Sequence, residues 1–153
     1  MDAVQVRRNV ALLDTRNSTA GESAWDQLRP LGDAVVPFLL EFYPKCRTWQ
    51  GRTALLFHAT RYARATDAAV ELGILALGDR SFMVRYRACG LLAYSLRRDA
   101  LPPLKLLLPH LDSRTVEDAE AAIDSITNRN HHFFVDRDHS GHVHWIVNES
   151  DDG

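Results

Sequence analysis

The fold is decided by the stretch Arg80-Ser-Phe-Met-Val-Arg-Tyr-Arg-Ala-Cys-Gly-Leu-Leu-Ala-Tyr-Ser-Leu96. Its apolar residues recur at intervals of three and four, through Val84, Ala88 and Leu91/Leu92, and so form one stripe along an α-helix. Asp79 stands just before this stretch and is suited to cap the helix. The stretch therefore predicts an amphipathic helix that turns its apolar stripe toward a core.

The segment that follows is apolar on nearly all sides and reads Ala100-Leu-Pro-Pro-Leu-Lys-Leu-Leu-Leu-Pro-His-Leu111. Proline is well tolerated in the first turn of a helix, where its missing N–H has no intrahelical partner. We therefore expect an inner, well-buried helix over this segment.

The two-part pattern of these helices recurs along the chain. Asp79 and Asp112 are 33 residues apart, Ala34 and Ala68 are 34 apart, and Ala68 and Ala100 are 32 apart. Such a period is typical of helical hairpins that stack side by side. We expect three to four hairpins over about residues 22–127. The pattern places these residues in the core: Val84, Ala88, Leu92, Leu104, Leu107, Val116 and Ile123.

This pattern resembles that of HEAT-repeat proteins, in which an Asp caps the first helix and a Val-Arg pair lies one turn inside it. The residues that carry the resemblance are Asp79, Val84-Arg85, Ala88, Leu92, Pro103, Leu107, Asp112, Val116 and Ala119. The fourth unit departs from the pattern, because Glu117 follows Val116 where Arg is expected. The resemblance implies a short α-solenoid and specifies no activity.

After Asn128 the apolar pattern changes to a period of two. The runs His131–Asp136 and His142–Val147 are separated by a turn in which Asp138 and Gly141 suit the first and last positions. We predict a β-hairpin at residues 131–148 that covers the last open face of the solenoid. The fold class is therefore mainly α, a solenoid with a C-terminal β-hairpin, in a single domain over residues 1–153.

The composition is that of an ordinary globular protein. Of 153 residues, 46% are apolar and 25% are charged, and no signal sequence or long apolar run is present, so we expect a cytoplasmic protein. Residues 1–111 carry fifteen Lys/Arg against ten Asp/Glu, a net +5, whereas residues 112–153 carry three against ten, a net −7. Cys46 and Cys89 lie far apart and should be small buried apolar residues.

Five histidines crowd the predicted hairpin beside Asp136 and Asp138, namely His131, His132, His139, His142 and His144. A zinc or nickel site is one interpretation, but the spacing matches no closed structural motif. Asp136-x-Asp138-x-Ser140-Gly141 imitates the start of a calcium loop, whose twelfth position requires Glu and here holds Val147. We therefore interpret the segment as turn chemistry and expect no metal or other cofactor.

Acidic residues form the candidate binding site. On the helix over Val116–Ile126, Glu117, Glu120 and Asp124 follow one flank with Asp118 nearby, and Asp136 and Asp138 add charge from the hairpin. Like charges repel, so such a concentration is easier to understand if a basic partner relieves it. We predict that these six residues contact a partner, with Trp145 as an aromatic anchor.

These patterns favour a protein-binding module over an enzyme. A small HEAT-like protein that ends in this turn and a Trp resembles bacterial toxin-immunity proteins, which implies a cognate, basic, nucleic-acid-attacking toxin domain as the partner. One alternative is a HEAT-like enzyme, either a chromophore lyase or a DNA glycosylase using Trp25, Trp49 or Tyr62; another is a scaffold or adaptor subunit. The arginines of the middle helices could bind phosphate, but the chain lacks a strongly basic balance, so we expect neither nucleic-acid nor membrane partners.

Overall fold

Every regular element of the protein is helical. The computed structural model describes residues 1–152, and no β-strand occurs within that range. The α-helices are α1 (Ala3–Ala11), α2 (Ser18–Leu28), α3 (Val36–Phe42), α4 (Trp49–Thr60), α5 (Asp67–Ala76), α6 (Phe82–Ser95), α7 (Leu101–Lys105) and α8 (Ser113–Thr127). Short 3₁₀ turns are η1 (Arg29–Val35), η2 (Tyr43–Lys45), η3 (Arg98–Ala100), η4 (His131–Phe134) and η5 (Glu149–Asp152).

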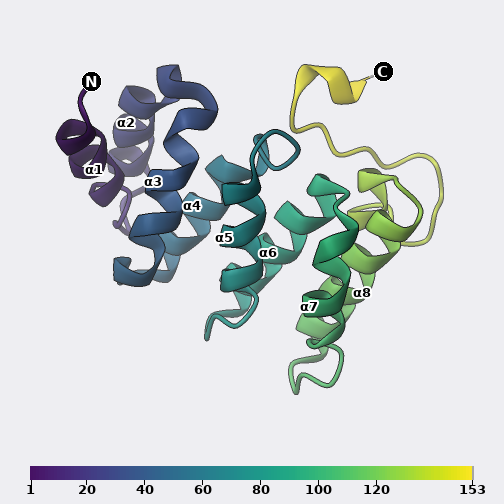
Figure 1. The fold of residues 1–153 in the computed structure, drawn as a ribbon. Helices are drawn as coiled ribbons and strands as arrows, with labels where there is room; N and C mark the ends of the chain where they lie inside the picture. The colour runs from purple at the N-terminus through teal and green to yellow at the C-terminus, as the bar shows by residue number, and fades with distance from the viewer. Residues whose placement is uncertain (153) are drawn as a thin grey trace.

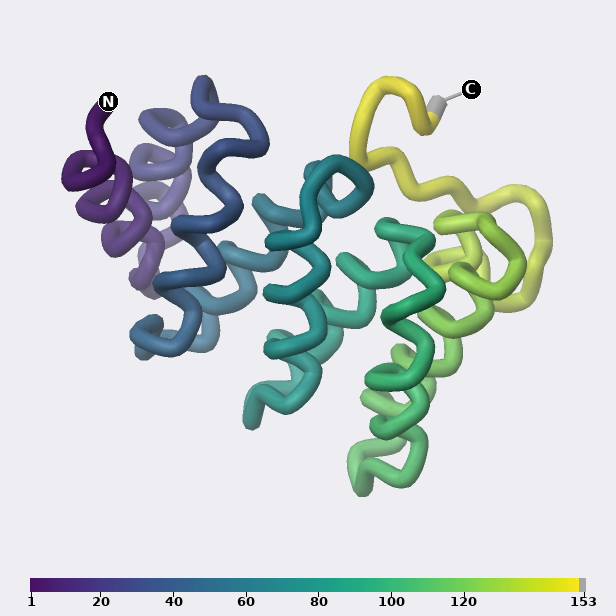
Figure 2. The backbone as a smooth tube through the Cα atoms, in the orientation of Figure 1, coloured from purple at the N-terminus to yellow at the C-terminus, as the bar shows by residue number. Residues whose placement is uncertain are grey.

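The helices are stacked in two layers (Figures 1 and 2). One layer holds α1, α3 and α5, and the other holds α4, α6 and α8, with each helix packed against the next in its layer. Contacts between α3 and α4, between α4 and α5, and between α5 and α6 join the layers, while α2 packs on α1 and α7 packs on α8. The helices begin earlier than the pattern from residue 22 predicts, because Asp2 caps α1 and Asn17 caps α2.

Two ion pairs, one buried and one partly buried, connect successive helices of the second layer at the same interval. Arg52 of α4 donates to Asp79 ahead of α6 through Nε (2.8 Å) and Nη2 (3.2 Å). Arg85 of α6 donates to Asp112 ahead of α8 (3.3 Å). Arg52 and Arg85 each lie four residues after the N-cap residue of their helix. The corresponding residue of α8 is Val116, so the series of ion pairs ends there. Asp112 caps α8 as expected, whereas Ser81 and not Asp79 occupies the N-cap position of α6.

The predicted core is confirmed for Val84, Ala88, Leu92 and Leu104, which are fully buried. Leu107, Val116 and Ile123 are only partly buried against that core. The two cysteines are free and buried, as their surroundings in the sequence predict.

The prediction of a long inner helix over residues 100–111 is wrong. Pro102 and Pro103 do begin a helix, but α7 ends at Lys105, and Leu106 and Leu111 are 80% and 101% exposed. Among the described helices α8 is the main neighbour of α7, so Leu104 and Leu107 pack inward while Leu106 and Leu111 remain exposed.

The predicted C-terminal β-hairpin at residues 131–148 is also wrong. Residues 142–146 form no regular secondary structure, and Trp145 packs against Tyr94 and Phe134 where the prediction placed a second strand. Side chains take over the bonds that a ladder would provide. His132 Nδ1 accepts from the Trp145 N–H (2.9 Å), and the Asp151 carboxylate accepts from the N–H groups of Val147 (2.9 Å) and Asn148 (2.8 Å).

The turn within this segment is built on Asp136. Its buried carboxylate accepts hydrogen bonds from the backbone N–H and hydroxyl of Ser140 (3.0 and 2.7 Å) and from the Gly141 N–H (2.8 Å). Gly141 has φ of 79°, a conformation that glycine adopts without strain. The interpretation of this motif as turn chemistry is therefore confirmed. Within residues 1–152 no helix has the length and apolar character needed to cross a bilayer.

Candidate binding groove

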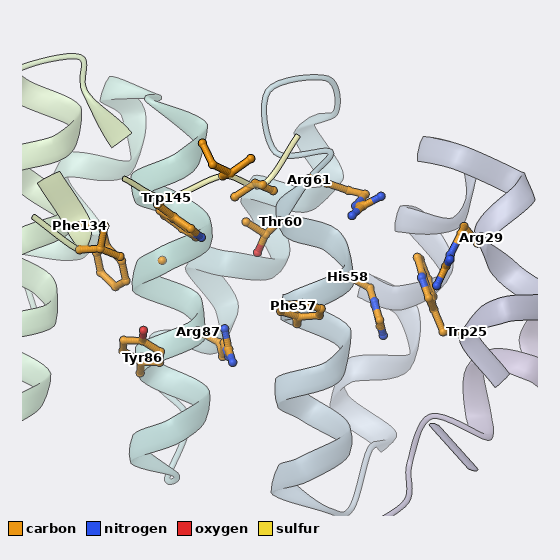
Figure 3. Close-up of a pocket in the computed structure, with 14 residues that line it drawn as sticks. Trp25, Arg29, Phe57, His58, Thr60, Arg61, Tyr86, Arg87, Phe134 and Trp145 are labelled. Atoms are coloured by element: carbon orange, nitrogen blue, oxygen red, sulfur yellow. The ribbon is translucent and has the colours of Figure 1, made fainter. Parts of the chain in front are cut away.

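A groove lies over α2, α4 and α6, and the C-terminal segment forms one of its walls (Figure 3). Its cavity has a volume of about 330 Å³. Trp25 comes from α2, Phe57 and His58 from α4, Tyr86 from α6 and Trp145 from the C-terminal segment. A second hollow toward the loop between α1 and α2 shares Phe57, His58 and Arg87 with this cavity, so the two adjoin each other.

The floor of the groove is aromatic. The rings of Trp25 and His58 are stacked, with centroids 4.0 Å apart and planes 8° from parallel. Trp25 is the buried member of this stack. Phe57, on the same helix as His58, is 56% exposed. An exposed large aromatic side chain at the bottom of a concave surface is typical of a binding site.

Gly90 allows the C-terminal wall to approach α6 closely. A Cβ at this position would lie 3.2 Å from the Phe134 ring and 3.6 Å from the Trp145 ring. Phe134 and Trp145 in turn lie side by side, with centroids 5.6 Å apart. A side chain at position 90 would therefore push the wall outward.

The wall is held by His131. Its Nδ1 accepts from Arg64 Nη2 (3.0 Å), so its Nε2 carries the proton and donates to the Trp145 carbonyl (2.8 Å). Burial lowers the pKa of His131, which keeps the ring neutral in this arrangement. Tyr94 of α6 donates to the Asp151 carboxylate (3.0 and 2.9 Å), which fixes the end of the segment.

Arginines surround the floor, and Figure 3 shows Arg29, Arg61 and Arg87 around Phe57 and His58. Arg29 pairs with Asp26 (3.1 Å) on the exposed side of α2. Within residues 1–152, neither Arg61 nor Arg87 forms an ion pair, and none of the lining residues of this cavity is Asp or Glu. Burial, together with the charges of Arg61 and Arg29, lowers the pKa of His58 to about 4. The positive charge of the groove at neutral pH therefore comes from the arginines.

The structure brings only part of the predicted acidic site together. Glu117 and Glu120 are exposed on α8 and share a shallow depression with Asp124, Phe133 and Arg137. Asp124 is engaged by Asn128 Nδ2 (2.7 Å) and by His139. The ridge of Glu117, Glu120 and Asp124 is therefore a surface feature, as the helical spacing predicts.

The other predicted partner-binding residues have different surroundings. Asp118 is buried, and its Oδ1 accepts from Arg137 (2.9 Å), while Asp136 holds the turn described above. Asp138 is exposed on that turn. Trp145 lines the groove, so it lies apart from the ridge and is not surrounded by it.

Three of the histidines lie together: the His132 ring is 4.0 Å from that of His131 and 5.2 Å from that of His144, between centroids. Within the described part of the chain, no three of the His, Cys, Asp and Glu side chains are grouped so that they could hold a metal ion. His142 and His144 are exposed, and His139 is stacked on Phe133 with centroids 3.7 Å apart.

Sequence reasoning missed the groove residues Phe57, His58 and Tyr86, and it treated Arg61 and Arg87 as members of a general arginine face. One signal was present: an aromatic residue is followed directly by a basic one in Phe57-His58 of α4 and in Tyr86-Arg87 of α6. That the two pairs meet in one groove follows only from the packing of α4 against α6. Comparison with protein-family models and with curated protein sequences finds no match to this chain.

Proposed function

We propose that this chain is a HEAT-like protein-binding module that acts in the cytoplasm as an immunity-type antidote, binding and neutralising the toxin domain of a cognate protein. The observation that carries the proposal is the groove itself, in which the partly exposed Tyr86 and Trp145 accompany Arg61 and Arg87. Trp, Tyr and Arg are the residue types that contribute most of the binding energy in protein interfaces. A rigid helical stack presents such residues at a small cost in conformational entropy.

The charge distribution supports the same proposal. Glu117 and Glu120 are exposed on α8, in the part of the chain with a net charge of −7. Domains that attack nucleic acids carry basic surfaces, so this acidic end would accelerate their capture by electrostatic attraction. In this proposal the α8 carboxylates steer the toxin domain and the groove supplies the contact.

The groove favours binding over base excision chemistry. An enzyme that acts on an extruded base needs a catalytic acid or base beside the aromatic pocket. Of the aromatic residues considered for that role, Trp25 lines the groove, but Trp49 and Tyr62 do not. The groove instead presents arginine and aromatic side chains to whatever it binds.

The test begins with the protein encoded by the gene next to this one, which we expect to carry a toxin domain. Co-expression of the chain should restore the growth of cells that produce the domain, and isothermal titration calorimetry with purified proteins should show a one-to-one complex. Phe57→Ala and Arg87→Ala should weaken both results. The matched control variants Leu75→Ala and Arg98→Ala change exposed residues outside the groove and should behave as the unmodified chain does.

Two outcomes would reject this function. One is that the neighbouring gene encodes no toxin domain and instead belongs to an operon for chromophore proteins or for DNA repair. The other is a toxin domain that forms no complex with the folded chain. A stable complex without growth rescue would identify an adaptor and reject the antidote.

A further inference from the structure

Arg87 is poised to bind a carboxylate. Its guanidinium lies over the rings of Phe57 (5.2 Å to the centroid) and Tyr86 (5.6 Å). Within residues 1–152 it makes no ion pair, and its side chain donates to no acceptor, although it is partly buried. A guanidinium stacked on aromatic faces keeps its N–H edge free, and that edge matches the two oxygens of a carboxylate.

Arg61 extends the same chemistry along the groove. Its backbone carbonyl accepts a hydrogen bond from Asn148 Nδ2 (3.0 Å), which ties this position to the C-terminal wall while the side chain stays unpaired. In the cavity that the two arginines line, Phe57 and Ile146 expose apolar surface, with 56% and 49% of their surface accessible. A ligand that fits must therefore combine negative charge with an apolar side chain.

The positive patch is too short for a polyanion. At one end Glu22 lines the adjoining hollow and Asp26 neutralises Arg29. At the other end Asp151 lies 3.8 Å from Arg64, beside Glu149 in η5. Nucleic acids gain affinity from many phosphate contacts in a row, but the flanking arginines Arg29 and Arg64 are already paired with carboxylates, so the unpaired positive charge is limited to the groove. A short acidic segment of a protein needs positive charge only within the groove, so it fits a patch of this length.

We infer that the groove binds an acidic segment of the partner protein. In this inference Arg87 and Arg61 each bind a carboxylate of the segment, and a neighbouring apolar side chain of the segment packs on Phe57. This inference rests on the proposed function and specifies its contact. The groove then prefers a negatively charged ligand, whereas the acidic α8 ridge attracts positive charge. The inference therefore requires a toxin domain that is basic overall and presents one acidic loop to the groove.

The experiment uses two peptides as probes, acetyl-Gly-Asp-Leu-Phe-Glu-Gly-amide and its analogue with Lys in place of Asp and Glu. Each is titrated into the ¹⁵N-labelled chain, and the indole N–H signals of Trp25, Trp49 and Trp145 are followed by NMR. The acidic peptide should shift the signals of Trp25 and Trp145, which line the groove, and leave that of Trp49, which does not. The lysine peptide should shift none of them.

Charge reversal identifies the arginines responsible. Arg87→Glu or Arg61→Glu should weaken binding of the acidic peptide by on the order of tenfold or more. The control Arg98→Glu reverses an exposed, unpaired arginine outside the groove and should leave the affinity unchanged. Circular dichroism of each variant establishes that it is folded.

Several results would overturn the inference. Equal binding of the lysine peptide, shifts confined to Trp49, or full binding by the Arg87→Glu and Arg61→Glu variants would each do so, as would tighter binding of a single-stranded thymidine hexanucleotide at the same signals. Failure to neutralise the toxin domain, with the peptide result intact, would reject the antidote and keep the acidic preference. Neutralisation that survives both arginine reversals would keep the antidote and reject the acidic segment.

Discussion

Asp79 joins three parts of the chain through one carboxylate. It accepts hydrogen bonds from Arg52, from the Tyr43 hydroxyl and from the Ser81 N–H (2.9 Å). Burial acts to raise the pKa of Asp79, but these hydrogen bonds outweigh it and hold the pKa below its ordinary value. The carboxylate therefore favours the folded state in its charged form.

Asp79→Ala should lower the free energy of unfolding by about 3–5 kcal/mol, because it leaves the Arg52 guanidinium buried without its partner. Urea unfolding at neutral pH measures this loss. The control Asp67→Ala breaks an exposed pair with Arg97 and should cost less than about 1 kcal/mol. The contribution of Asp79 should be complete above the ordinary Asp pKa and disappear as the pH falls through its lower pKa in the folded protein. Equal losses for the two variants would contradict this assignment.

His58 should remain neutral to unusually low pH. Its pKa of about 4 reflects first its burial and then the charges of Arg61 and Arg29. Because the unfolded chain binds this proton more readily, stability should fall as the pH drops from about 6.5 to about 4. An NMR titration of the His58 ring measures the pKa, which should rise in Arg61→Gln and stay unchanged in Arg98→Gln. An ordinary His pKa in the unmodified protein would disprove the burial of this ring.

At the scale of residues, the sequence predicted the centre of the core better than its edge. Val84, Ala88 and Leu92 of α6 and Leu104 of α7 are fully buried as predicted, but burial on α6 is not confined to one stripe, because every residue from Ala88 to Ser95 is buried. Asp118 and Asp136 were expected on a binding surface, but both are internal because Arg137 and the Ser140–Gly141 backbone supply their partners. These partners belong to irregular structure, which no periodic pattern describes.

At the scale of elements, periodicity predicted the helices and misjudged the C-terminal segment. A period of two indicates extended backbone with one covered side, but here only Trp145 and Val147 are partly covered and Val143 is exposed. His131 and His132 hydrogen-bond the backbone of Trp145. The pattern carries no information on whether another strand or a set of side chains provides the hydrogen bonds. The groove depends on this wall, so its shape was beyond prediction as well.

The short helix α7 gives a prediction at the same scale. Leu104→Ala should cost about 2–5 kcal/mol, because this side chain is fully buried. The loss at Leu107 should be smaller than the sequence pattern implies, because that residue is only partly buried. Leu106→Ala is the matched control, since Leu106 is 80% exposed. Chemical denaturation of the three variants gives the order, and a loss at Leu106 equal to that at Leu104 would show that α7 extends further.

For the whole molecule, the separation of charge predicts the kinetics of association. Reversal of Glu117 and Glu120 to Lys should slow capture of a basic toxin domain and weaken its dependence on salt, while the fold stays intact because both residues are exposed. Asp118 and Asp124 are left unchanged since both have partners within the chain. Stopped-flow measurements at several salt concentrations test this, with Asp33→Lys and Glu71→Lys on other helices as the control pair. Unchanged rates would remove the α8 ridge from the encounter.

The even spacing of the two ion pairs of the second layer makes the stack extensible by protein engineering. Arg52 and Arg85 are 33 residues apart, as are Asp79 and Asp112. A second copy of residues 49–81 inserted after Ser81 would bring its own Arg and Asp, and Ser81 would replace Thr48 as the residue before the new helix. The lengthened chain should gain helical circular dichroism, grow longer in small-angle X-ray scattering and still unfold in one transition. Each such insertion would add one helical hairpin with its own Arg–Asp pair, so the length of the domain could be set by the number of copies.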